Sequence, residues 1–284
     1  AFVSENQASW SKNASIGASN YLWFLRHVSF VNYTAAELTD IGEQQLARAE
    51  ASLAAEQAKN NANGVGPLPP IASSLVAQIR DTARRSLQIR SFLNRTGLLR
   101  LPAWFDAGSS RAKAAYTVRA IPPWLSPFDY SSLGEEDDFT TAAEKGYNFV
   151  RYIPPPKEGL PFFLDSMARD ARAVIVHEGI PGHWTQFRFA WRNRREARRH
   201  WLDSTVNEGW AYYWEETPLV AGLWDDSPRL RETMYNFMRL RAIRVKVDVG
   251  LATGAMDFAS AVAYFQTQVP MSQAEAEGEV LARL

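Results

Sequence analysis

The pattern of hydrophobic and polar positions predicts a chain made mostly of helices. Thr34-Ala35-Ala36-Glu37 is a capping box, in which threonine and glutamate pair with the first free backbone N–H groups of a helix. The Ala-, Glu- and Gln-rich stretch that follows predicts a helix ending in the loop 60–64. A second helix is expected from about Ser73 to Asn94, with Gly97 just beyond its end.

The middle of the chain changes to a pattern typical of strands. Segments 116–121 and 148–153 are rich in β-branched and aromatic residues, and each is followed by prolines. They predict two short strands that form one small sheet. The acidic run 135–138 between them is expected to be a solvated loop.

Helical spacing returns after residue 164. Met167, Ala171 and Val174 are spaced by four and then three residues, and His177 extends that stripe by three more. A later helix should begin at Ser227-Pro228 and run to about Gly250. Because no segment resembles a linker, we expect a single mainly helical domain over residues 1–284.

Composition limits the classes of function. The chain has 284 residues, 46% of them hydrophobic and 22% charged, as in ordinary globular proteins. A formal net charge of zero gives no field that would attract nucleic acid or an anionic membrane. No apolar run approaches the length of a membrane span. The absence of cysteine excludes thiolate metal sites and a cysteine nucleophile. We expect a periplasmic or secreted protein, with the cytoplasm as the alternative.

The segment 177–183, His-Glu-Gly-Ile-Pro-Gly-His, carries the candidate chemistry. In many zinc hydrolases a helical histidine binds the metal and the next glutamate takes a proton from the activated water. The usual second histidine lies four residues on, where this chain has Pro181. His183 lies six residues on, and a straight helix would hold it about 120° away from His177. We expect Pro181-Gly182 to kink or break the helix and so bring the two rings together.

Glu208 is the best candidate for a third ligand, which would leave one tetrahedral position open. It lies on a predicted helix over 205–215 that should stop near Pro218, and Tyr212 shares its face. Two simpler interpretations compete with functional roles here. Glu208 could complete a capping box with Thr205, and the arginine-rich run 188–199 could be a solvated helix face.

These residues resemble the signatures of the bacterial DUF885 family. Segment 177–186 is similar to its HExxPGHxxQ motif, and Glu208-Gly209-Trp210-Ala211 followed by Tyr213 is similar to its EGWAxY motif. Segment 244–251 resembles its R-x-x-x-D-x-G-L element, and 33–38 resembles its YTxxEL element. The resemblance runs from about residue 30 to the end of the chain. Family members are commonly longer, with a Pro- and Tyr-containing segment expected after Leu284.

The resemblance implies a mainly α, helical gluzincin-like metallohydrolase domain with a small β element. It implies His177, His183 and Glu208 as ligands of one ion, Zn²⁺ or another divalent metal. Glu178 is the implied catalytic base.

The leading hypothesis is a zinc-dependent metallohydrolase that cleaves a peptide or related amide bond, with Glu178 as general base. Tyr212, Tyr213 or an arginine would stabilise the oxyanion, and Arg241 could hold a substrate carboxylate. Asp248 could orient a ligand histidine, or simply form a helix ion pair with Arg244.

Two alternatives remain open from the sequence. A metal beside a glutamate base could instead serve a lyase or dehydratase acting on a small carboxylate-bearing substrate. A metal could also stabilise a non-catalytic binding protein. The expected partner is a peptide or small-molecule substrate, without nucleic acid and without a membrane span.

Overall fold

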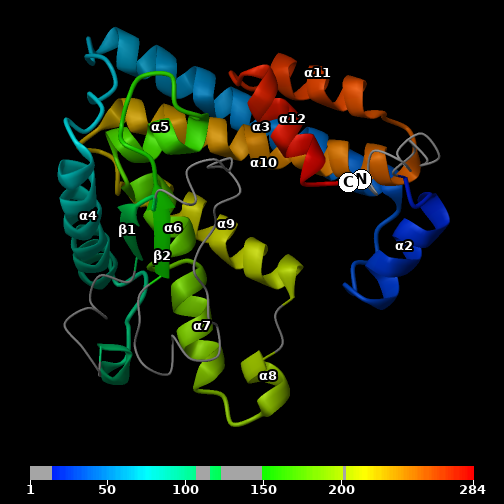
Figure 1. Ribbon diagram of the computed structural model, residues 1–284, viewed down its shortest axis with the longest axis horizontal. Helices are drawn as coiled ribbons and strands as arrows, with labels where there is room; N and C mark the ends of the chain where they lie inside the picture. Colours follow the sequence, from blue (N-terminus) through cyan, green and yellow to red (C-terminus); the bar gives the residue numbers. More distant parts are fainter. Residues whose placement is uncertain (1–14, 107–115, 123–148, 201–202) are drawn as a thin grey trace. The chain divides into compact units, whose positions relative to one another are not determined.

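A computed structural model describes residues 15–106, 116–122, 149–200 and 203–284 (Figure 1). The protein is mainly helical with one small two-stranded sheet, as the sequence predicts. The chain divides into two compact units, one combining residues up to 55 with 235–284 and the other comprising 56–234. The single domain expected over residues 1–284 stays a prediction. The acidic run 135–138 lies outside the described residues.

The first unit is a group of helices drawn from both ends of the chain. Its elements are α2 (Ala18–His27), the first part of α3 (Ala35–Ala62), the later part of α10 (Pro228–Thr253), α11 (Phe258–Gln268) and α12 (Gln273–Leu281). The predicted capping box is confirmed, because Thr34 N donates to Glu37 at 2.7 Å and Glu37 N donates to Thr34 Oγ1 at 3.2 Å. Two ion pairs join its helices, Arg244 with Glu279 and Lys246 with Glu43.

The second unit holds the sheet and the helices that follow it. In chain order its described elements are α4 (Leu75–Thr96), the short helix η2 (Ala103–Asp106), β1 (Tyr116–Ala120), β2 (Phe149–Ile153), α5 (Phe162–Arg169), α6 (Arg172–Glu178), α7 (His183–Trp191), α8 (Glu196–His200) and α9 (Ser204–Val220). Ser74 caps α4, and Gly97 ends it with a left-handed φ of 71°. Both features agree with the predicted helix.

The two predicted strands are confirmed as one parallel pair. Tyr116 pairs with Phe149 and Ala120 pairs with Ile153 at the two ends of the register. β1 packs against α4, and α4 in turn contacts α6 (Figure 1). Val118 and Ile153 are buried, so the sheet contributes to the core of this unit.

The apolar stripe predicted across residues 167–177 is divided between two helices. α5 ends at Arg169 and α6 begins at Arg172, with Asp170 extended between them. The Asp170 carboxylate accepts a hydrogen bond from the backbone N–H of Arg172 at 3.0 Å. An aspartate that bonds the backbone two residues on favours a turn over a continuing helix, and this explains the break.

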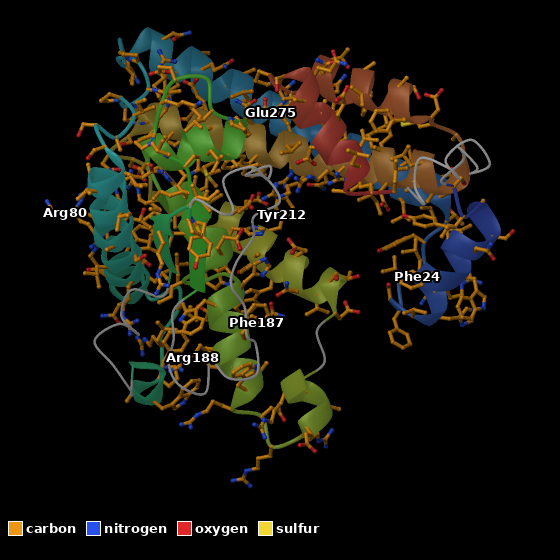
Figure 2. All side chains as sticks on the ribbon, in the orientation of Figure 1. Phe24, Arg80, Phe187, Arg188, Tyr212 and Glu275 are labelled. Atoms are coloured by element: carbon orange, nitrogen blue, oxygen red, sulfur yellow. The ribbon has the colours of Figure 1, made fainter. Side chains whose placement is uncertain are left out.

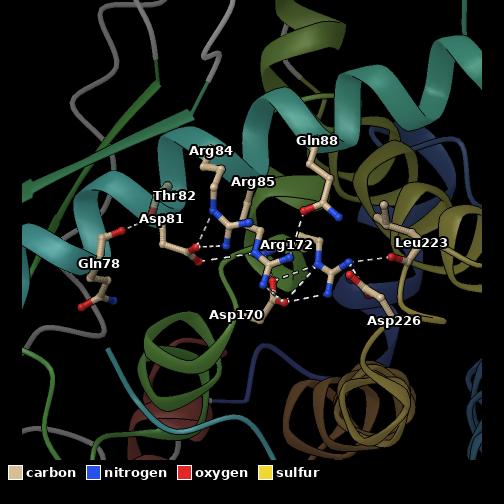
Figure 3. Close-up of polar contacts among 10 residues, drawn as sticks. All are labelled: Gln78, Asp81, Thr82, Arg84, Arg85, Gln88, Asp170, Arg172, Leu223 and Asp226. Carbon is tan, nitrogen blue, oxygen red and sulfur yellow. Dashed lines mark hydrogen bonds and ion pairs between the residues drawn. The ribbon is translucent and has the colours of Figure 1, made fainter. Parts of the chain in front are cut away.

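A buried charge network fixes the start of α6 (Figure 3). Arg172 and Asp170 are both fully buried and pair at 2.7 Å, and Arg85 of α4 reaches Asp170 at 3.1 Å. Arg172 also donates to the carbonyl of Leu223 at 2.7 Å and to Asp226 at 2.8 Å. Leu223 and Asp226 follow the end of α9, so this network ties the beginning of α6 to the end of α9.

α6 is buried along its whole length. Its middle residues, 173–176, are apolar on every side and therefore need a core around them, and α6 packs against α4 and α9. Among the described helices, none has the length and apolarity needed to cross a bilayer.

Candidate metal centre

The two histidines of segment 177–183 converge at a gap between two helices. α6 ends at Glu178 and α7 begins at His183, so the helix stops and restarts where a kink was expected. The ring centroids of His177 and His183 lie 4.7 Å apart and the rings are nearly perpendicular. The six-residue spacing therefore produces a pair of adjacent imidazoles, because the chain is not helical between them.

Glu208 of α9 completes the group. One of its carboxylate oxygens lies 3.4 Å from His177 Nε2, and the other lies 3.4 Å from His183 Nε2. Ligand atoms from the three residues all lie within 4.8 Å of one another, so the cluster could hold a metal ion. Both histidines are buried, while the Glu208 side chain is 61% exposed. The cluster is thus open to solvent on the side of α9.

A second carboxylate contacts the other ring nitrogen of His177, Nδ1. Glu215 Oε1 lies 2.6 Å from His177 Nδ1, and the Glu215 side chain is only 1% exposed. A carboxylate on the outer nitrogen of a ligand histidine fixes the ring and its tautomer, which leaves Nε2 for a metal. The spacing of Glu208, Tyr212 and Glu215 puts all three on one face of α9. That spacing is the sequence signal that could have identified the role of Glu215.

Charges of opposite sign meet closely in this cluster. Burial by itself would lower the pKa of His177, but the negative charges of Glu178, Glu208 and Glu215 outweigh it and raise that pKa to about 9. Burial would raise the pKa of Glu208, but hydrogen bonds and charge from both histidines hold it well below its usual range. Without a metal, the surrounding carboxylates thus favour a proton on the His177 imidazole.

The turn between the two helices is packed against His177. A side chain at Gly182 would overlap the backbone carbonyl of His177, so only glycine fits this close approach. The Ile180–Pro181 peptide bond is cis. From α9, the Trp210 indole N–H donates to the carbonyls of Pro181 at 2.9 Å and Gly182 at 3.1 Å.

The other predicted site residues have different positions. Glu178 is buried at the end of α6, and its charge acts directly on His177. Tyr212 is half-buried on α9 (Figure 2), whereas Tyr213 is 58% exposed and packs edge-on against Trp214. Arg241 belongs to α10 in the other compact unit, where its charge helps to lower the pKa of Glu279.

Of the two roles suggested for Asp248, that of orienting a ligand histidine belongs to another residue, and the ion pair with Arg244 stays a prediction. Glu215 is the carboxylate that holds the outer nitrogen of His177. Asp248 accepts a hydrogen bond of 2.6 Å from the hydroxyl of Tyr21. Burial and this carboxylate together raise the pKa of Tyr21 strongly. Arg244, the other half of the suggested helix pair, makes two hydrogen bonds to Glu279.

The capping-box interpretation of Glu208 needs correction, whereas the solvated face is confirmed for Arg192, Arg194, Arg195 and Arg198 but not for Arg188. Asp203, rather than Thr205, caps α9 by accepting from Val206 N, so Glu208 is not part of a capping box. In the arginine-rich run, Arg188 is buried, donates to the carbonyl of Phe105 at 2.7 Å and lies over aromatic rings (Figure 2). α9 also continues through Pro218 to Val220, beyond the predicted end.

Two solved structures show the same fold. One is described as "the putative lipoprotein from Colwellia psychrerythraea", with 15% identity and a TM-score of 0.75, over 99% of this chain and 48% of that one. The other is "a putative lipoprotein of unknown function from Shewanella oneidensis", with 18% identity and a TM-score of 0.69, over 98% of this chain and 51% of that one. The chain therefore spans about half the length of each.

Among curated proteins, none matches the chain. The model of one protein family, described as bacterial protein of unknown function (DUF885), matches residues 1–281. That range includes His177, His183 and Glu208, as well as the segments whose resemblance to DUF885 signatures was noted from the sequence. The chain belongs to the DUF885 family.

Proposed function

We propose that this chain carries a zinc-dependent hydrolase site that cleaves a peptide or related amide bond. The observation that carries the proposal is the convergence of His177, His183 and Glu208 from three different helices onto one point. Under this proposal the fold is a helical gluzincin-like metallohydrolase domain.

The donor set fits zinc. Two imidazole nitrogens and one carboxylate are a common set of protein ligands in catalytic zinc sites, where a fourth position stays open. The exposure of Glu208 leaves room for such a position on the α9 side. His183 Nδ1 is buried and has no hydrogen-bond partner within the described part of the chain, and Nε2 faces Glu208. Another divalent metal with similar preferences could take the same place.

Glu178 is the proposed general base. It follows the ligand His177 directly, it is buried, and its charge acts on that ring. Zinc bound there would polarise the scissile carbonyl and acidify a water molecule. The Glu178 carboxylate would accept the proton of that water and later deliver it to the leaving amine.

The first experiment tests the metal and the base together. Glu178→Gln should keep one zinc per chain, measured by elemental analysis, and lose at least about 100-fold in peptide turnover, because general-base catalysis contributes about 10² to 10⁴. Glu196→Gln, on the exposed helix α8, is the matched control and should behave like wild type. If Glu178→Gln retains its turnover, Glu178 is not the base. A wild-type protein that takes up no zinc would remove the premise.

The products identify the reaction. Release of new amino termini from a peptide library supports amide hydrolysis. Formation of a double bond in a small carboxylate-bearing substrate would support the lyase alternative instead. A zinc-loaded protein without either activity would indicate the binding role.

The cellular location is proposed as periplasmic or secreted. Both structures of the same fold are described as a "putative lipoprotein", a class of protein that is typically exported, and this description supports the assignment. Because the chain spans about half of each, the activity and substrates of a longer protein are likewise proposals.

A further inference from the structure

We infer that Trp210 is a positioning residue for the metal centre, because its indole N–H fixes the turn that brings His183 beside His177. The inference rests on the proposed metal site and adds a residue that hydrogen-bonds to the backbone between the two histidines. Two observations support it: the conformation of the turn formed by residues 179–182, and the hydrogen bonds that this turn receives from α9.

Besides the close approach of Gly182 to His177, few described contacts define the shape of this turn. α7 has no side-chain cap at its start, since its N-cap position is Gly182. Pro181 cannot donate a backbone hydrogen bond. The Thr185 bonds to the Gly179 carbonyl are long, at 3.4 and 3.5 Å. External hydrogen bonds to such a segment therefore have a large influence on its geometry.

Trp210 supplies two such bonds to consecutive carbonyls. Its Nε1 lies 2.9 Å from the Pro181 oxygen and 3.1 Å from the Gly182 oxygen. Pro181 and Gly182 are buried. The Gly182 carbonyl also accepts from Gln186 N at 3.2 Å, so among the described residues only the Pro181 carbonyl would lose its donor, at a cost of about 1–3 kcal/mol. The second carbonyl belongs to the residue directly before His183. An indole held there sets the direction in which α7, and with it the His183 ring, leaves the turn.

Trp210 also connects this turn to the helix that carries the third ligand. It lies two residues after Glu208 on α9, and the same helix carries Glu215, which holds His177. One rigid helix thus presents Glu208, orients His177 through Glu215 and positions His183 through Trp210. An error of a few tenths of an ångström in this turn would move one ligand relative to the other two.

The chain provides a matched control one helical turn away. Trp214 lies on α9, is 4% exposed, and packs against Trp210 with ring centroids 5.8 Å apart. Its Nε1 has no hydrogen-bond partner within the described segments. Replacement of either tryptophan by phenylalanine removes a similar volume, but only the change at 210 removes hydrogen bonds to the turn.

The experiment measures zinc affinity by competition with a chromophoric chelator, together with the visible absorption of bound Co²⁺, which reports the ligand arrangement. Trp210→Phe should bind zinc about 10- to 100-fold more weakly, as expected when a partner outside the ligand shell is lost. Its Co²⁺ spectrum should also change. Trp214→Phe should match wild type in both measurements.

A second variant removes the hydrogen bond without changing shape. Benzothienylalanine replaces the indole N–H by sulfur, so a protein carrying it at position 210 keeps the aromatic packing. It should show the same loss as Trp210→Phe, and the analogue at position 214 should show none. This variant decides the matter if Trp210→Phe does not fold.

The outcomes separate this inference from the proposed function. If wild type binds zinc and both position-210 variants bind it with the same affinity, the role of Trp210 is overturned and the metal site remains. Equal weakening by the changes at 210 and 214 also overturns it, because packing alone would then explain the effect. A wild-type protein that binds neither zinc nor Co²⁺ removes the metal site itself.

Discussion

Three glutamates around His177 differ in exposure, and their environments suit them to different tasks. Glu215 is 1% exposed and holds the outer nitrogen of the ring. Glu208 is 61% exposed and bridges both histidines at the open side of the cluster. Glu178 is buried beside the ring. In a metal site these positions correspond to an orienting group, a ligand and a base.

The positions of the two tyrosines on α9 predict which of them stabilises the oxyanion. Each residue of a helix turns about 100°, so Tyr212 lies about 40° from Glu208 around α9, whereas Tyr213 lies about 140° away. We therefore expect Tyr212, rather than Tyr213, to stabilise the oxyanion. Tyr212→Phe should reduce kcat about 10²- to 10³-fold with unchanged zinc content, in the range found for a lost oxyanion donor.

Tyr213→Phe is the control for this comparison. Its side chain is 58% exposed and packs on Trp214, so steady-state kinetics should stay close to wild type. A larger loss at 213 than at 212 would contradict the assignment and transfer the role to the exposed tyrosine.

Among the elements, α6 depends most on charges at its beginning. It is short and buried, and its first residue, Arg172, pairs with Asp170 and Asp226 while donating to the Leu223 carbonyl. These contacts join α6 to α4 and to the segment after α9 (Figure 3). The helix that carries His177 is thus anchored at the end opposite to the histidine.

Asp170→Asn should therefore destabilise the protein strongly. The change leaves Arg172 buried without its main counter-charge, and removal of one partner of a buried pair typically costs about 3–5 kcal/mol. Urea unfolding followed by tryptophan fluorescence measures the loss.

Asp81→Asn provides the comparison for this change. Asp81 is 30% exposed and pairs with Arg84 and Arg85 on α4, so its loss should cost no more than about 1 kcal/mol. Equal effects of the two substitutions would show that the buried network adds nothing beyond a surface pair.

The whole molecule consists of two compact units, and the candidate ligands all belong to one of them. His177, His183 and Glu208 lie within residues 56–234. Binding of an ion stabilises the part of a protein whose opening would release it. Zinc should consequently act on the two units unequally.

Hydrogen exchange can measure this difference. Zinc at about 100 times its Kd should add about 2.7 kcal/mol to the stability of the unit that binds it. Amide protection should increase in α6, α7 and α9 and stay unchanged in α2, α11 and α12. His183→Ala should abolish the increase. Equal protection of both units would instead indicate that they unfold together.

Local patterns were enough to predict many of the elements. The capping box at Thr34, the cap and glycine around α4, the strand-forming segments and the Ser227-Pro228 start act through bonds within a few residues. The ligand candidates were also predictable, because histidine and glutamate are metal-binding residue types and Pro181 predicts the break in the helix between the two histidines.

Other features depend on contacts between distant segments. The break at Asp170 requires a buried Arg172 with partners 51 and 54 residues away. The role of Glu215 requires α9 to lie against α6, and burial of Arg188 requires a carbonyl at Phe105, 83 residues earlier. Periodicity reports the face of a helix but not which neighbour covers that face.

The sequence by itself determined the family, the mainly helical class with its small sheet, and the three residues that could hold a metal. The tertiary structure decided how they converge. It ended α6 at Glu178 and placed Gly182 against the His177 carbonyl. It also placed Glu215 of α9 on the outer nitrogen of His177 and Trp210 of α9 on the turn before His183. The physical reason is that a metal centre needs ångström-scale placement, which packing and hydrogen bonds between helices supply.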